Sequence, residues 1–256
     1  MRRHLYHLIT LGGLVTVAGT APGADLSGNW DNGAGIDFVR PERIGKSICL
    51  MGCEDEEASP VTEDPAPPPA RIDRPRYLPE FQARVDDLNA RQVEEDPVLR
   101  CEPPGVPRIG PPDKIVQTQT EIVFLYDDVS GNFFRVIPTD GRPHRDDVER
   151  SFLGDAIGWW EDDTLVVETL NFNDETWLTD DGSFHTTGLR VIERLSLEDG
   201  LLSWQATAYD PAVLAEPWVL PVRKAVPAMS GILEAPLCLE RDLKHMVDDS
   251  HHTNPR

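Results

Sequence analysis

Short apolar runs separated by turn residues follow one another from residue 114 to residue 209. Each run has the length of a β-strand, and Asp, Gly and Asn cluster between several of them. Compact turns at 127–132 and 198–200 join neighbouring runs, which predicts an antiparallel meander. Because an open sheet exposes its edges, we expect a barrel or a strongly curled sheet. The predicted strands are 115–120, 121–126, 133–138, 156–160, 164–170, 189–195 and 201–209.

The clearest hairpin lies in the stretch from Gly158 to Trp177, GWWEDDTLVVETLNFNDETW. An acidic turn at 161–163 separates an aromatic strand end from an apolar strand, and no proline interrupts the run. The residues after the hairpin mix amide, carboxylate and aromatic side chains, which a simple turn does not need. They are therefore the first candidates for handling a ligand.

Alternation along two of the strands brings arginines together on one face. Arg135 interrupts apolar residues in the strand at 133–138, and Arg190 and Arg194 do so at 189–195. Side chains alternate between the two faces of a sheet, so these arginines predict a polar face opposite a packed one. That face is either solvated or lines a charged pocket inside a barrel, and both alternatives stay open.

One helix is predicted before the strands. Phe81, Val85 and Leu88 fall at helical spacing, Pro79 suits a first turn, and Pro97 stops the run, so the helix lies near 80–95 and docks on the protein's own core. The segment 54–79 is acidic and rich in proline and reads as a linker or an extended wrap. The expected organisation is a signal segment at 1–24, an arm, linker and helix at 25–113, a β domain at 114–238 and a tail at 239–256.

Composition limits the class of partner. The chain of 256 residues fits one sizeable domain, and its formal net charge of −21 argues against nucleic acid and anionic membranes. Arg2 and Arg3 precede a short apolar core and small residues, as in a secretory signal, with cleavage after Ala24 or Ala21. No later stretch is long and apolar enough for a membrane span. We expect a periplasmic or secreted protein of undetermined oligomeric state.

Four cysteines in an exported chain favour two disulfides. Of the three possible pairings, we predict Cys49 with Cys53 and Cys101 with Cys238. The second bond ties the segment before the strands to the segment after them. A metal site is disfavoured, because the spacing lacks a paired C-x-x-C and no histidine lies close in sequence to these residues.

Four motifs stand out along the chain: a DLSG-x-W start at 25–30, C-x-P-P-G-x-P-R at 101–108, W-x-x-D-T-L-V-V at 160–167 and F-N-D-x-T-W-L at 172–178. In these motifs the chain resembles a largely uncharacterised family of exported bacterial proteins. The acidic insert at 54–64 departs from the family. The resemblance implies no reaction. The Gly-x-Trp start, Gly28 to Trp30, is also similar to the entry of lipocalin-like barrels, in which the tryptophan plugs the barrel end; an irregular arm is the other interpretation.

His185 is the first candidate for acid/base chemistry. We expect Asp174 to orient its ring, because a carboxylate that accepts from one imidazole nitrogen leaves the other free to move a proton. Asn173 and Trp177 lie in the same polar loop as possible substrate contacts. A loop histidine that only bonds its neighbours is the competing interpretation.

Other candidates lie on the predicted strands and on a second loop, which would meet the His185 loop if both sit at the same barrel mouth. Tyr126, Arg135 and Arg190 could polarise a substrate oxygen. His144, in GRPHRDD, could face His185, although a solvated turn has the same composition. Trp160 could stack on a flat ligand, although such aromatics more often belong to the core. Tyr209, near a strand end, is a candidate donor to a ligand carbonyl or phenol.

Two function classes follow from these residues. The first is a cofactor-independent lyase or isomerase that acts on an apolar or aromatic small molecule through His185. The second is a noncatalytic protein that holds such a molecule in the same pocket. The sequence contains no Gly-rich phosphate loop, no G-x-S-x-G and no H-E-x-x-H, which argues against nucleotide enzymes, ordinary serine hydrolases and zincins.

Overall fold

The computed structural model describes residues 23–32, 74–234 and 238. The expected signal segment, the Cys49–Cys53 pairing, most of the acidic linker and the C-terminal tail lie outside these residues. The helical elements are 3-10 turns at Pro79–Phe81 and Pro97–Arg100 and the α-helices α1 (Gln82–Ala90) and α2 (Gln92–Glu95). The strands are β1 (Gly28–Asp31), β2 (Lys114–Gln117), β3 (Glu121–Asp128), β4 (Gly131–Pro138), β5 (Asp155–Glu161), β6 (Thr164–Leu170), β7 (Arg190–Glu198), β8 (Leu201–Tyr209), β9 (Trp218–Val219) and β10 (Arg223–Pro227).

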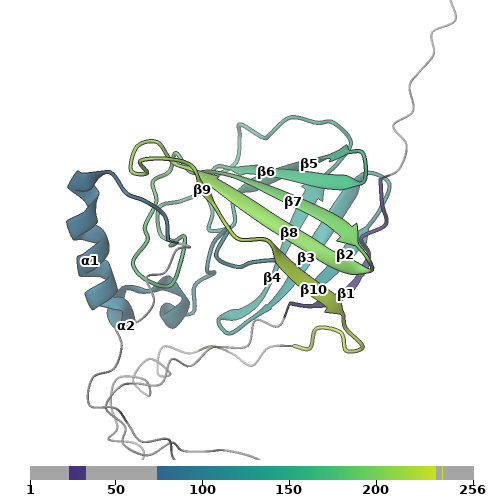
Figure 1. Ribbon diagram of the computed structural model, residues 1–256, viewed down its shortest axis with the longest axis horizontal. Coiled ribbons are helices and arrows are strands. Elements are labelled where there is room, and N and C mark those ends of the chain that lie inside the picture. The colour runs from purple at the N-terminus through teal and green to yellow at the C-terminus, as the bar shows by residue number, and fades with distance from the viewer. Residues whose placement is uncertain (1–22, 33–73, 235–237, 239–256) are drawn as a thin grey trace, which may run out of the picture.

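The strands form a nearly closed antiparallel barrel (Figure 1). Nine strands follow in the order β4-β3-β2-β1-β10-β8-β7-β6-β5, and β9 pairs with β8 at the side of this path. β1 joins the two halves, because it pairs with β2 through Gly28 and Asn29 and with β10 through Trp30 and Asp31. The mainly β fold and all seven predicted strands are confirmed.

The Gly-x-Trp start forms a first strand, β1, rather than an irregular arm. Trp30 is buried in the core, and its indole Nε1–H donates to the carbonyl of Leu26 at 3.2 Å. The sequence did not predict β9 and β10. Both are short, and Pro217, Pro221 and Pro227 interrupt the alternation that would mark them.

The barrel remains open at one seam, since β4 and β5 share no ladder pair within the described residues. At one end of the seam the two strands pack closely. A methyl group added to Gly158 of β5 would lie 3.0 Å from Ile137 Cγ2 and 3.2 Å from Thr139 Cγ2. The other end of the seam carries the groove described below.

The predicted polar face does not exist as one surface. Arg190 and Arg194 are exposed on the outer wall, whereas Arg135 is buried inside the barrel. On β4 the apolar Phe134 and Val136 point outward and are 66% and 45% exposed. Arg135 therefore shares the inward phase of β4 with the buried Ile137, and Glu193 pairs with its charge there.

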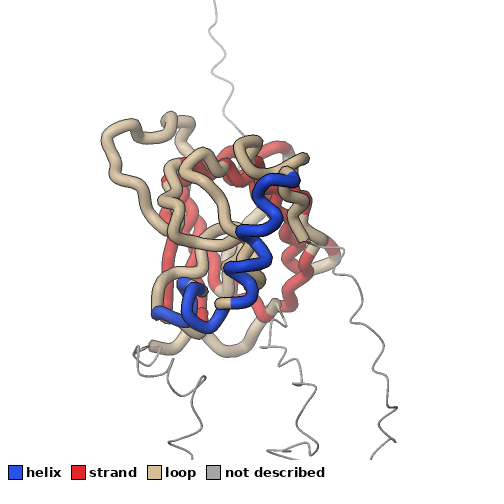
Figure 2. The backbone as a smooth tube through the Cα atoms, turned by 90° about the vertical axis from the view of Figure 1, so that its left-hand side faces the viewer, coloured by secondary structure: helices blue, strands red, loops and turns tan. Residues whose placement is uncertain are grey.

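The predicted helix is present and lies across one end of the barrel (Figure 2). Val85 is buried, and Phe81 and Leu88 pack against the core, as their spacing predicted. The helix rests on Gly182, where an added Cβ would lie 2.6 Å from Asn89 N and 2.7 Å from Val85 O. The absence of a side chain at Gly182 therefore allows this close approach.

Cys101 and Cys238 form the predicted disulfide, with their Cα atoms 5.5 Å apart. The bond spans 137 residues of sequence. It links the segment that follows the helices to a residue beyond the last strand. Among the described helices, none is both long and apolar enough to cross a membrane.

Candidate functional site

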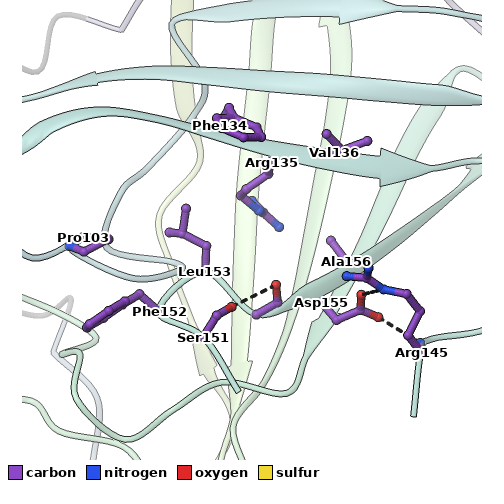
Figure 3. Close-up of a pocket in the computed structure, with 11 residues that line it drawn as sticks. Pro103, Phe134, Arg135, Val136, Arg145, Ser151, Phe152, Leu153, Asp155 and Ala156 are labelled. Carbon is purple, nitrogen blue, oxygen red and sulfur yellow. Dashed lines mark hydrogen bonds and ion pairs between the residues drawn. The ribbon is translucent and has the colours of Figure 1, made fainter. Parts of the chain in front are cut away.

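A groove with a volume of about 480 Å³ lies at the open part of the seam (Figure 3). β4 contributes Phe134, Arg135 and Val136, and β5 contributes Asp155 and Ala156. The loop between these strands supplies most of the remaining wall, and Pro103, from the segment before β2, completes it. The groove is lined by Pro103, Phe134, Arg135, Val136, Arg145, Ser151, Phe152, Leu153, Gly154, Asp155 and Ala156.

The walls of the groove are mainly apolar, and its charges are paired. Arg145 Nε donates to Asp155 Oδ1 at 2.8 Å, and the backbone N–H of Arg145 donates to Asp155 Oδ2 at 3.1 Å. Burial opposes ionisation of Asp155, but hydrogen bonds from His144 and Arg145 outweigh it and lower the pKa of this carboxyl. The carboxylate form is therefore held at the groove wall.

Arg135 extends from β4 into the space beside the groove (Figure 3) and reaches partners on three other strands. Its Nη1 donates to the Tyr126 hydroxyl at 3.1 Å, and its Nη2 donates to Thr169 Oγ1 at 2.7 Å. Glu193 Oε2 lies 2.6 Å from Nη2 as an ion contact without hydrogen-bond alignment, and Trp204 Nε1 donates to Glu193 Oε1 at 3.0 Å. A charge pair thus sits inside the barrel.

The protonation states of this internal cluster follow from its burial and contacts. Burial opposes the charge on Arg135, but Glu193 outweighs it and raises the pKa of the guanidinium. Burial also raises the pKa of Tyr126 above its ordinary value, so this residue stays a neutral phenol. The Nε of Arg135 is buried and has no hydrogen-bond partner among the described residues.

A second cluster forms on the outer wall around His144. Its Nδ1–H donates to Asp155 Oδ2 at 3.0 Å, and its Nε2 lies 3.3 Å from Glu168 Oε2. Arg190 Nε donates to Glu168 Oε1 at 2.6 Å, and the Arg190 guanidinium lies 5.1 Å from the centre of the Tyr209 ring. These contacts hold the loop between β4 and β5 against the barrel wall.

His185 lies elsewhere, buried and with both ring nitrogens engaged. The Thr176 hydroxyl donates to Nε2 at 2.6 Å, and Nδ1–H donates to the Thr186 carbonyl at 3.0 Å. Burial lowers the pKa of His185, so the neutral ring is favoured. Asp174 is exposed and makes no hydrogen bond to this histidine in the described structure; only a charge interaction connects them. His185 does not line the groove.

The remaining candidates have local contacts. Asn173 Oδ1 accepts from the backbone N–H of Glu175 at 3.4 Å. Trp177 is buried in the core and pairs through a β-bridge with Phe184. Trp160 packs partly buried against the core.

The structure therefore divides the candidates into separate groups. Tyr126 and Arg135 meet inside the barrel, where Arg135 also pairs with Glu193. His144 and Arg190 meet at Glu168 outside it, with Tyr209 beside Arg190. His144 does not face His185, because each has its own partners on a different wall. Sequence reasoning missed Glu193, although it shares its strand phase with Val191 and Leu195, and a charge in an apolar phase signals a buried partner.

The described residues contain no group of three or more histidine, cysteine or acidic side chains that could hold a metal ion. Comparisons of the chain with protein-family models, with curated proteins and with solved structures gave no match.

Proposed function

We propose that this protein is exported and binds an apolar or aromatic small molecule in the groove between β4 and β5. The observation that supports this proposal is the groove itself, which has a volume of about 480 Å³, mostly apolar walls and a few fixed polar groups. This volume falls in the range of about 300–1,000 Å³ that small-molecule sites occupy, and such sites have this mixture of walls. The exposed Phe134 and Val136 extend the apolar surface at its rim.

Binding accounts for the geometry better than catalysis through His185. A general base needs a free nitrogen beside the reacting atom. Both nitrogens of His185 are occupied by Thr176 and Thr186, and the ring lies away from the groove. The noncatalytic alternative requires no such group.

A neutral fluorescent probe, N-phenyl-1-naphthylamine, tests the binding proposal. We expect its emission to rise on addition of the protein and to saturate. Ser151→Trp places an indole at the groove wall and should abolish the rise, because Ser151 lines the groove with an exposed side chain. Thr187→Trp, at an exposed position outside the groove, is the matched control and should bind as the wild type does. Equal binding by both variants would contradict the proposed site.

One observation favours the lyase or isomerase as a second candidate. Asp155 lines the groove, so its carboxylate is the group that a substrate would meet, and His144 positions this carboxylate through the Nδ1–Oδ2 hydrogen bond of 3.0 Å. Exchange of the α-hydrogens of 2-acetylnaphthalene in D₂O measures this activity. An enzyme of this kind accelerates the exchange, and His144→Gln slows it, whereas a binding protein leaves the exchange rate unchanged. If His185→Ala loses the acceleration and His144→Gln keeps it, His185 is the acid/base residue.

Export is proposed from the signal-like start and is compatible with the Cys101–Cys238 bond. Expression of the full chain in a bacterium with a periplasm tests it. The mature protein should be recovered from the periplasm or medium with an N-terminus near Asp25. Retention of the uncleaved chain in the cytoplasm would contradict export.

A further inference from the structure

The chemical class of the ligand can be inferred from Arg135, on the premise that the groove is the binding site. The guanidinium carries five N–H donors. Its Nη atoms contact Tyr126, Thr169 and Glu193, whereas its Nε–H has no acceptor among the described residues. An unpaired buried donor costs free energy, so an acceptor supplied by a ligand would be stabilised there.

The arginines at the groove are already paired with carboxylates, so the site does not need an anionic ligand. Arg135 is paired with Glu193, and Arg145 is paired with Asp155. A carboxylate ligand would add an uncompensated negative charge to a partly buried site, which is costly. A neutral oxygen, in contrast, accepts the Nε–H bond and leaves both ion pairs intact.

The backbone edge of β4 offers further donors on the same side. Thr139 N–H donates to Thr120 O at 2.8 Å, which identifies this pair as a hydrogen-bonded one. Hydrogen-bonded pairs alternate along an antiparallel ladder, so Ile137 and Arg135 also bond to β3. The main-chain groups of Phe134 and Val136 then point to the seam, where β4 has no partner strand.

We infer that the groove binds a neutral carbonyl compound, such as a ketone, ester or amide on an apolar or aromatic body, with its oxygen accepting from Arg135 Nε–H. The apolar body lies against Phe152, Leu153 and the rim residue Phe134. Arg135 lines the groove but its Nε is buried, so we expect the ligand oxygen to reach this atom by displacing neighbouring side chains.

Three probes of nearly equal shape test this inference: 2-acetylnaphthalene, 2-ethylnaphthalene and 2-naphthoate, each titrated calorimetrically into the wild-type protein. The ketone should bind at least about ten-fold more tightly than the hydrocarbon, the ratio expected for a hydrogen bond to a charged donor. The carboxylate should bind more weakly than the ketone. Equal affinities for ketone and hydrocarbon, or tightest binding of the carboxylate, would overturn the inference but leave the groove as a binding site. Binding of none of the three would contradict both proposals.

Arg135→Lys provides the variant, because lysine keeps the charge beside Glu193 and removes Nε–H. It should lose the preference for the ketone over the hydrocarbon while still binding the hydrocarbon. A retained preference would overturn the role of Arg135. The infrared carbonyl stretch of 2-acetylnaphthalene bound to the wild type is a readout that does not depend on the folding of the variant. It should lie below its value in hexane, and an unchanged stretch would overturn the inference.

Discussion

Arg135 on β4 and Glu193 on β7 meet inside the barrel, where Nη2 lies 2.6 Å from Oε2 and the side chains are 3% and 0% exposed. Neither strand is adjacent to the other in the sheet, so the contact crosses the interior. Two buried charges are tolerable because each neutralises the other, and because Tyr126, Thr169 and Trp204 bond to the Nη atoms of Arg135 and to Oε1 of Glu193; only Nε–H of Arg135 lacks an acceptor among the described residues.

Removal of one partner of this pair should be strongly destabilising. Glu193→Gln leaves a buried guanidinium without a counter-charge, and we expect a loss of about 3–5 kcal/mol in the free energy of unfolding. Denaturant titration measures it. The double variant Arg135→Met with Glu193→Leu should lose less than the sum of the losses in Arg135→Met alone and Glu193→Leu alone, since no unpaired charge remains. Additive losses would show that the two residues are not coupled.

The Cys101–Cys238 bond should contribute to stability because it closes a long loop. Its sequence separation is 137 residues, and cross-links of long loops restrict the unfolded chain most. Cys101→Ser should lower the free energy of unfolding by roughly 2–5 kcal/mol. The matched comparison is denaturation of the wild-type protein with and without reductant. If the denaturation midpoint of Cys101→Ser equals that of the oxidised wild type, the bond does not contribute to stability.

Alanine substitutions at Gly182 and Gly200 distinguish the cost of backbone strain from the cost of close packing. Their φ angles are similar, +79° and +81°, but only Gly182 lies against the helix, while a Cβ at Gly200 meets nothing within 4 Å. Alanine imposes comparable strain at both positions. Gly182→Ala should cost about 1–3 kcal/mol more than Gly200→Ala, because overpacking adds to the strain. Thermal unfolding measures the difference, and equal costs would show that the helix yields freely.

His185 should make the protein less stable in mild acid. Its pKa is lowered in the folded state by burial, so the unfolded chain binds a proton more readily. Its stabilising effect is complete above its ordinary unfolded pKa, about 6.5, and is lost as the pH falls toward the depressed folded value. His185→Gln should show a shallower dependence of unfolding free energy on pH between about 7 and 5. An identical slope in wild type and variant would contradict this account.

The strands and the helix were predictable because their signals are local. Short apolar runs between turn residues marked every strand from β2 to β8, and the spacing of Phe81, Val85 and Leu88 marked the helix. The Cys101–Cys238 bond followed from the position of the two cysteines on either side of the strand region. β9 and β10 were missed because they are short and broken by proline, so their pairing with β8 depends on the rest of the sheet.

The candidate site was only partly predictable. Residue types placed Tyr126, Arg135, His144 and Arg190 among the candidates, but not their partners. Asp155, Glu168 and Glu193 lie on other strands, and their contacts require the registers of the ladders. The expected approach of His144 to His185 likewise depended on an assumed common barrel mouth, and the loops lie apart.

The sequence by itself determined the antiparallel β class, the position of the helix and the pairing of two cysteines, because periodicity and spacing are written along the chain. Only the tertiary structure decided which face of each strand points inward, where the barrel stays open and which charges meet. Arg135 shows the reason: its neighbours Phe134 and Val136 are more apolar but exposed, whereas Arg135 faces the interior and pairs there with Glu193 of β7. Such an outcome depends on contacts between residues far apart in sequence, which no local pattern contains.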